Sequence, residues 1–264
     1  MSTKRFILPV FLFIFCLGFS LVKGENSDMF QRRWNHVSEN SAVIYWQLDS
    51  ISKAATSYVE YGTTEDLGQQ TPETEKPRWA HFHRINGLET GVTYYYRMVV
   101  NMEGMRLESE ILQLAPEKVE NTYYIPQDVS GGPPYMLYQS GATYVLTEDI
   151  TANGTAIIVQ GGEITLDLNG HTVIFGNNTS SQVFGVRIES EDSCKVMNGK
   201  IVQGERSGDY SNAIRSWNRG NFGVEICGIS TAVPLDTAQP MVFRHDQLEV
   251  HHNDIYSRVI NLDS

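Results

Sequence analysis

The chain has 264 residues, a formal net charge of −11 at pH 7 and a sequence pI near 5.1. Nucleic acid binds to surfaces rich in Lys and Arg, so the acidic balance argues against nucleic acid as a partner. At this length the chain has room for about two domains of ordinary size.

Residues 1–24 have the pattern of a signal peptide. Lys4 and Arg5 precede an apolar run over residues 6–22, which is short for a bilayer span and is interrupted by Pro9. This pattern predicts a secreted or cell-surface protein with no stable membrane span after cleavage. The alternative is an uncleaved membrane anchor.

Residues 35–115 are expected to form a β-sandwich. Segments 41–48, 57–61 and 93–100 are short and rich in β-branched and aromatic residues, and turns with Gly, Pro or Asn separate them. Leu88 precedes a turn and Tyr94 follows it, a spacing that lets the Tyr94 hydroxyl bond back to the turn backbone, as in a tyrosine corner.

The same segment resembles a fibronectin type III domain, through Trp46, the corner at Tyr94 and the aromatic run 94–96 followed by Arg97. Segments 57–62 and 81–88 are similar to the sandwich that precedes the catalytic domain of purple acid phosphatases. The metal ligands of those phosphatases belong to that catalytic domain, so the resemblance implies no active site here. His81 and His83 share a strand face but have no evident third ligand, so we expect hydrogen-bonded filler and predict no metal site.

Residues 116–138 are expected to be a linker, because Pro116, Pro126 and the run Gly131-Gly132-Pro133-Pro134 break any regular pattern. Residues 139–264 then show a slow, strand-rich recurrence. Val196, Val224 and Val250 open apolar runs that lie 28 and 26 residues apart. A recurrence at this period without helical patterning predicts a solenoid of stacked β-coils, with these three valines in successive coils.

The runs Ile164–Val173 and Val196–Ile201 resemble the right-handed parallel β-helix of pectate-lyase-like proteins, over about 120 residues to the C-terminus. That fold serves lyases, hydrolases, adhesins and phage tail proteins, so the resemblance implies a fold and no single activity. Only nine residues follow the last predicted rung, 248–255. A solenoid needs a terminal cap, so we expect a fragment that continues beyond Ser264; the alternative is self-association through the open solenoid end.

The densest group of titratable side chains is predicted to be catalytic if the protein is an enzyme: Arg244, His245, Asp246 and His251. The resemblance implies that polysaccharide lyases on this fold use an outward Arg or Lys base beside acidic calcium ligands. The alternative is structural, with Val250 inward and His251 solvated.

A polar excursion between rungs is the predicted ligand-binding region, because aromatic rings beside arginines suit an acidic sugar: Trp217, Arg215, Arg219 and Tyr210. Alternatively, Trp217 packs against the solenoid wall. Acidic residues on neighbouring rungs could hold calcium, although the polar face of a strand is the simpler interpretation; these are Glu163, Asp167, Glu189, Glu191 and Asp192. No other cofactor is indicated. Cys194 and Cys227 could pair or remain buried thiols.

The sequence therefore predicts an exported all-β protein, a fibronectin type III-like β-sandwich followed by a right-handed parallel β-helix. It is expected to bind or process extracellular polysaccharide, possibly acidic, as a polysaccharide lyase or glycoside hydrolase if it is an enzyme. The alternative is a non-catalytic adhesin or structural surface protein. Residues 136–264 hold 15 acidic and 8 basic residues, which mildly favours the alternative or a calcium-bridged substrate.

Overall fold

The computed structural model describes residues 29–30, 32–48, 53–205, 211–216, 223–232, 239–243, 247–256 and 261–262. The predicted signal peptide lies outside these ranges. The described residues are almost entirely strands and turns. Within them, no helix reaches the length and hydropathy needed to cross a membrane.

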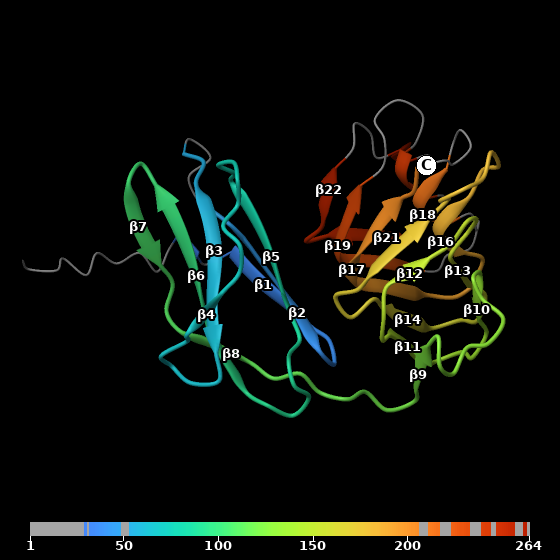
Figure 1. The fold of residues 1–264 in the computed structure, drawn as a ribbon, viewed down its shortest axis with the longest axis horizontal. Helices are drawn as coiled ribbons and strands as arrows, with labels where there is room; N and C mark the ends of the chain where they lie inside the picture. The colour runs from blue at the N-terminus through green and yellow to red at the C-terminus, as the bar shows by residue number, and fades with distance from the viewer. Residues whose placement is uncertain are drawn as a thin grey trace, which may run out of the picture.

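Two antiparallel sheets, built from residues 32–114, pack around one hydrophobic core (Figure 1). The first has the order β1-β2-β5, and the second has the order β4-β3-β6-β7 with β8 also paired to β6. Ile44 and Trp46 from the first sheet meet Val59 and Met98 from the second, all nearly inaccessible to solvent. The strands are β1 (Arg32–Val37), β2 (Ser41–Gln47), β3 (Thr56–Gly62), β4 (Gln69–Gln70), β5 (Ala80–Asn86), β6 (Tyr94–Met102), β7 (Met105–Glu108) and β8 (Leu112–Leu114).

The turn before β6 is fixed by the hydrogen bond that the sequence predicts. The backbone N–H of Glu89 donates to the Tyr94 hydroxyl at 3.0 Å, and Leu88 is buried beneath the turn. The predicted hydrogen bond of Tyr94 is confirmed.

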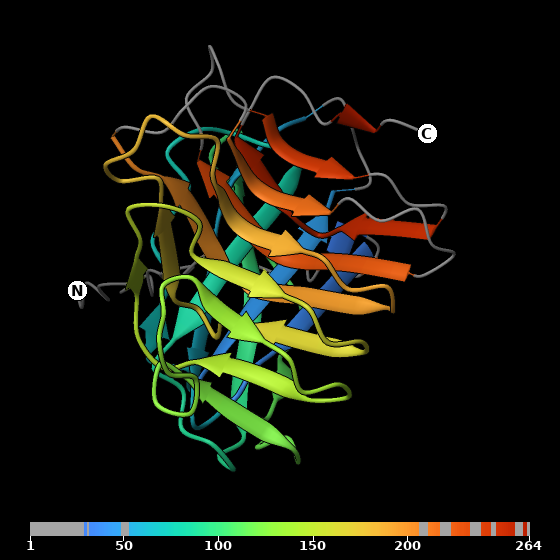
Figure 2. The same ribbon diagram turned by 90° about the vertical axis from the view of Figure 1, so that its right-hand side faces the viewer.

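From β9 onward the strands pair in parallel and form stacked coils (Figure 2). The strands are β9 (Thr122–Ile125), β10 (Tyr135–Leu137), β11 (Thr143–Leu146), β12 (Ile150–Thr151), β13 (Ile157–Val159), β14 (Ile164–Asp167), β15 (Thr172–Phe175), β16 (Phe184–Ile188), β17 (Cys194–Gln203), β18 (Asn212–Ser216), β19 (Gly223–Ala232), β20 (Gln239–Phe243), β21 (Gln247–His251), β22 (Asp254–Tyr256) and β23 (Asn261–Leu262).

Each complete coil presents three faces. The first face is formed by β9, β11, β14, the first halves of β17 and β19, and β21. The second face is formed by β12, β15, the second halves of β17 and β19, and β22. The third face is the sheet of order β10-β13-β16-β18-β20-β23. Ile, Val and Leu side chains from all three faces fill one continuous core.

The parallel stack starts earlier than the sequence predicts. β9 pairs with β11, and β10 pairs with β13, so residues 122–125 and 135–137 belong to the coils and not to a linker. Short strands among prolines carry too little periodicity to be recognised from sequence.

The register of the three valines is also corrected. Val196 pairs with Ile226, and Ile226 pairs with Val250, whereas Val224 lies two residues away, beside Cys194 and Leu248. The three valines lie in successive coils, as predicted, but the residues that pair in register across those coils are Val196, Ile226 and Val250. An error of two residues preserves which side chains face inward, because side chains alternate with a period of two.

A corner separates the first face from the second, and the chain turns it with left-handed backbone. Asn169, Asn198, Gly228 and His252 have φ values of 46°, 49°, 64° and 52°. Asn and Gly accept this conformation at low cost, and short Asn side chains can also form hydrogen bonds there. We call these four positions the corner residues.

The unit of two antiparallel sheets at residues 32–114, which we call the sandwich below, packs on the corner residues, and Figure 1 shows the sheet β1-β2-β5 facing the coils. Asn198 donates to the hydroxyls of Ser38 and Ser41 at 2.5 and 2.9 Å. Arg84 donates to the carbonyls of Gly199 and Gly228 at 2.7 and 3.2 Å. β2 is consequently buried on both faces along residues 41–44.

Cys194 and Cys227 are both buried, and both thiols are free. Their register partners are Val224 and Met197, so they are not opposite one another. The buried-thiol alternative therefore holds and the disulfide alternative does not.

Candidate functional site

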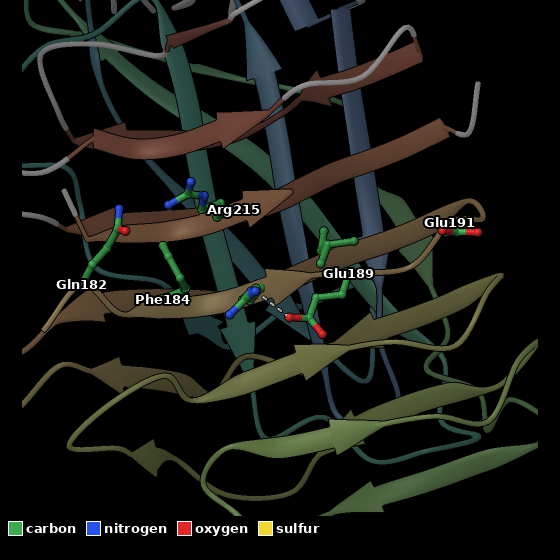
Figure 3. A pocket seen from close by; sticks show the side chains of 7 residues that line it. Gln182, Phe184, Glu189, Glu191 and Arg215 are labelled. Carbon is green, nitrogen blue, oxygen red and sulfur yellow. Dashed lines mark ion pairs between the residues drawn. The ribbon is translucent and has the colours of Figure 1, made fainter. Parts of the chain in front are cut away.

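A groove of about 520 Å³ lies on the third face, over β16 and β18 (Figure 3). Its lining combines two arginines, two glutamates, an amide and two apolar side chains: Gln182, Phe184, Arg187, Ile188, Glu189, Glu191 and Arg215.

The strand pattern places the two arginines side by side. Val186 and Ile188 are buried in the core, so the intervening Arg187 points outward and is exposed. Arg187 pairs with Arg215 in the parallel register, one coil apart, which separates their backbones by about 4.8 Å.

Phe184 lines the groove with only 6% of its surface exposed, and it packs against both arginines. The guanidinium carbons of Arg187 and Arg215 lie 5.8 and 5.0 Å from the centroid of its ring. These cation–π contacts hold both cations over one apolar surface.

Glu189 balances one of the charges. It accepts from Arg187 at 2.8 Å and from the Gln160 side chain at 2.7 Å; the dashed line in Figure 3 marks the ion pair. The groove thus offers guanidinium donors and an adjacent carboxylate. Guanidinium donors can hold the carboxylate of an acidic ligand.

Of the residues predicted to bind ligand, Arg215 lies in this groove, whereas Trp217, Arg219 and Tyr210 lie outside the described residues. Sequence reasoning missed Arg187 and Phe184. A signal was present, because Arg187 and Arg215 are 28 residues apart, the spacing between Val196 and Val224.

Of the residues predicted to be catalytic, Arg244, His245 and Asp246 lie outside the described residues. His251 ends β21 on the first face, whereas the groove is on the third. His251 Nε2 lies 3.2 Å from Glu225 Oε1, and His251 Nδ1 lies 2.8 Å from His252 Nδ1.

Asp167 is buried at the corner, where it accepts from the Ser38 hydroxyl at 2.8 Å and from the Asn169 backbone at 2.7 Å. Burial raises the pKa of Asp167 to about 6. Its register partners are Val145 and Met197, so no carboxylate stacks directly on it. Glu189 lies on the third face, so the stacked calcium ligands that the sequence suggests are not assembled around Asp167.

His81 and His83 form a hydrogen-bonded chain in the sandwich core. Ser57 Oγ lies 2.7 Å from His81 Nδ1 and 2.8 Å from His83 Nε2, and Thr71 Oγ1 lies 3.0 Å from His83 Nδ1. Both rings stack on Trp46. Burial lowers the pKa of His81 to about 3 and the pKa of His83 to about 4.

No protein-family model matches the chain, and no curated protein matches it. Its structure is similar to pectate lyase PelI from Erwinia chrysanthemi in complex with tetragalacturonic acid, with 12% identity, a TM-score of 0.29, and coverage of 86% of this chain and 76% of that one. For pectate lyase Pel3 from Pectobacterium carotovorum the identity is 10% and the TM-score 0.27, with coverage of 86% and 77%. A shared activity does not follow from likeness at this level.

Proposed function

We propose that this chain is an exported protein whose β-helix binds an acidic extracellular polysaccharide in the groove on its third face. A fibronectin type III-like sandwich at residues 35–115, a right-handed winding of the coils and removal of residues 1–24 are parts of the same proposal. The observation that carries it is the pairing of Arg187 with Arg215 on adjacent coils, with Phe184 in contact with both.

Arginines on adjacent coils suit such a ligand, because a linear acidic polysaccharide carries carboxylates at regular intervals along its chain. A bidentate guanidinium–carboxylate pair is planar and contributes about 1.5–3 kcal/mol when charge-assisted. The overall charge of −11 opposes the binding of a polyanion in the groove only weakly. Exposed charges that lie more than about 8 Å from the ligand are screened at physiological ionic strength.

Binding without cleavage is the form that the groove favours. A lyase needs a base that takes a proton from carbon, whereas Arg187 is ion-paired to Glu189, holds its proton and serves as a donor. This favours the adhesin or structural alternative over catalysis by Arg187. Lyase or hydrolase activity stays a prediction that depends on Arg244, His245, Asp246 and His251.

The test is titration calorimetry with oligogalacturonates, oligoguluronates and a neutral glucan of equal length. We expect binding of the acidic oligomers only, weakened about tenfold or more by Arg187→Ala or Arg215→Ala. Lys200→Ala removes an exposed charge from the second face and should leave binding unchanged.

Glu189→Gln sharpens the test, because it releases Arg187 from its partner and should tighten binding. Equal affinity for the neutral glucan, or unchanged affinity in both arginine variants, would refute the proposal. Absorbance from unsaturated products, followed with and without calcium, should not rise; a rise would move the assignment to an enzyme.

A further inference from the structure

Three histidines from the two halves of the chain meet at the edge of the domain junction. His36 is on β1 of the sandwich, His251 ends β21, and His252 is a corner residue. Each offers one ring nitrogen, and these atoms all lie within 4.8 Å of one another.

The corner explains how two neighbouring residues point the same way. Consecutive side chains in a strand face opposite sides, which would separate His251 from His252. His252 has a φ of 52°, so the chain turns there and brings His252 Nδ1 to 2.8 Å from His251 Nδ1. His36 Nε2 approaches from the sandwich to 3.4 Å from His252 Nδ1.

These separations approach those of a metal site. A tetrahedral ion with metal–nitrogen bonds of about 2.0–2.1 Å separates its ligand nitrogens by about 3.3 Å. The pair at 3.4 Å already has this spacing, and the pair at 2.8 Å reaches it with a small rotation of one ring.

Neighbouring side chains hold the rings of His251 and His252 in place, as the surroundings of a metal site hold its ligands. Trp34 and Tyr45 pack on the His252 ring, with centroids 4.1 and 4.9 Å away. His251 uses its other nitrogen to contact Glu225 Oε1 at 3.2 Å, and Lys195 pairs with the same oxygen at 2.9 Å. A carboxylate behind a histidine ligand sets its tautomer and increases its basicity.

We propose that His36, His251 and His252 form a zinc site that cross-links the sandwich to the β-helix, with Glu225 positioning His251 and a fourth position left to water. Imidazole nitrogen selects zinc and related transition metals over calcium or magnesium, which prefer oxygen. The site is independent of the polysaccharide groove, and its bound ion would stabilise the docked arrangement by mass action.

The experiment uses untagged protein that lacks residues 1–24. Bound metal is first removed with a chelator, and the protein is then titrated with zinc in competition with a chromophoric chelator. We expect one ion per chain, with the dissociation constant raised roughly 100-fold in His36→Gln and His252→Gln. Glu225→Gln should raise it about tenfold. His171→Gln is the matched control, because His171 is a partly exposed histidine that also faces a carboxylate, that of Asp149.

Cobalt supplies a second measurement on the unaltered protein, so that a variant that fails to fold does not decide the matter. Visible absorption of the intensity typical of four-coordinate cobalt, displaced by zinc, is the expected result. The proposal is overturned if the unaltered chain gives only the spectrum of hydrated cobalt, or if a folded His36→Gln variant binds zinc as tightly as the unaltered chain.

Discussion

Acid should destabilise the sandwich through His81 and His83, and the structure gives the size of the effect. Both rings are almost inaccessible to solvent, and they share Ser57 as a hydrogen-bond partner. An imidazolium needs an acceptor at each nitrogen, yet His81 Nε2 is buried without a partner in the described structure. Protonation in the folded state is therefore strongly disfavoured.

The sign follows from the two pKa values. Burial lowers the folded-state pKa of His81 to about 3 and of His83 to about 4, below the unfolded value of 6.5. The stability they contribute is present above pH 6.5 and is lost as the pH falls toward 4. Between pH 7 and pH 5 the loss is about 2 kcal/mol for each histidine, or about 4 kcal/mol together. This is a large share of a typical unfolding free energy of about 5–15 kcal/mol.

The assay is urea unfolding at pH 7 and pH 5, followed by tryptophan fluorescence with a chelator present. Trp46 lies in the sandwich core against both rings, so its emission reports this transition. The double variant His81→Gln/His83→Gln should lose about 4 kcal/mol less between the two pH values than the unaltered chain.

Other groups titrate in the same range, but they are common to both proteins and cancel in the comparison. Asp167, whose pKa burial raises to about 6, gains stability as the pH falls, while His36 and His252 lose it. An equal loss in the double variant and the unaltered chain would refute the reasoning.

Three further expectations concern the junction and the thiols. Asn198→Ala removes two hydrogen bonds to the sandwich and places Ala in left-handed backbone, so it should lower the free energy of unfolding in urea by about 3 kcal/mol. Asn198→Gly should lower it less, because Gly tolerates left-handed backbone. Arg84→Met removes the donor to the carbonyls of Gly199 and Gly228 and should increase the rate of limited proteolysis between the domains, while Arg106→Met on the distant edge of the sandwich should not. Cys194 and Cys227 should react with a thiol reagent only after unfolding, and reaction of either in the native protein would contradict their burial.

The sequence predicts features that depend on local chemistry. Tyr94 and its turn are recognisable because the hydrogen bond joins Tyr94 to Glu89, five residues away. The alternating run Ile164–Asp167 similarly predicts a strand with a buried face, and the corner at Asn169 follows from the preference of Asn-Gly for left-handed backbone.

Features that depend on register or on docking are not visible in the same way. The groove needs Arg187 and Arg215 aligned one coil apart, and a two-residue error like that at Val224 would separate them along the strands. The histidine cluster joins residues 36 and 252, and no local pattern links positions so distant. Ser41, Val43 and Tyr45 alternate with the core residues of β2 as an exposed face would, yet Ser41 and Val43 are fully buried.

Docking of the sandwich bears on the proposal that a ligand binds on the third face. The first face and its corner are partly covered, and one cleft there, of about 270 Å³, is lined by residues of both domains, among them Val37, Asp167 and Lys195. A polymer laid in that cleft would have to displace hydrogen bonds such as Ser38 to Asp167, each of which would leave a buried polar group without a partner. The hydrogen bonds from Ser38 and Arg84 of the sandwich reach the first face and its corner, whereas the groove of Arg187 and Arg215 lies on the third face, so a ligand there need not disturb these bonds.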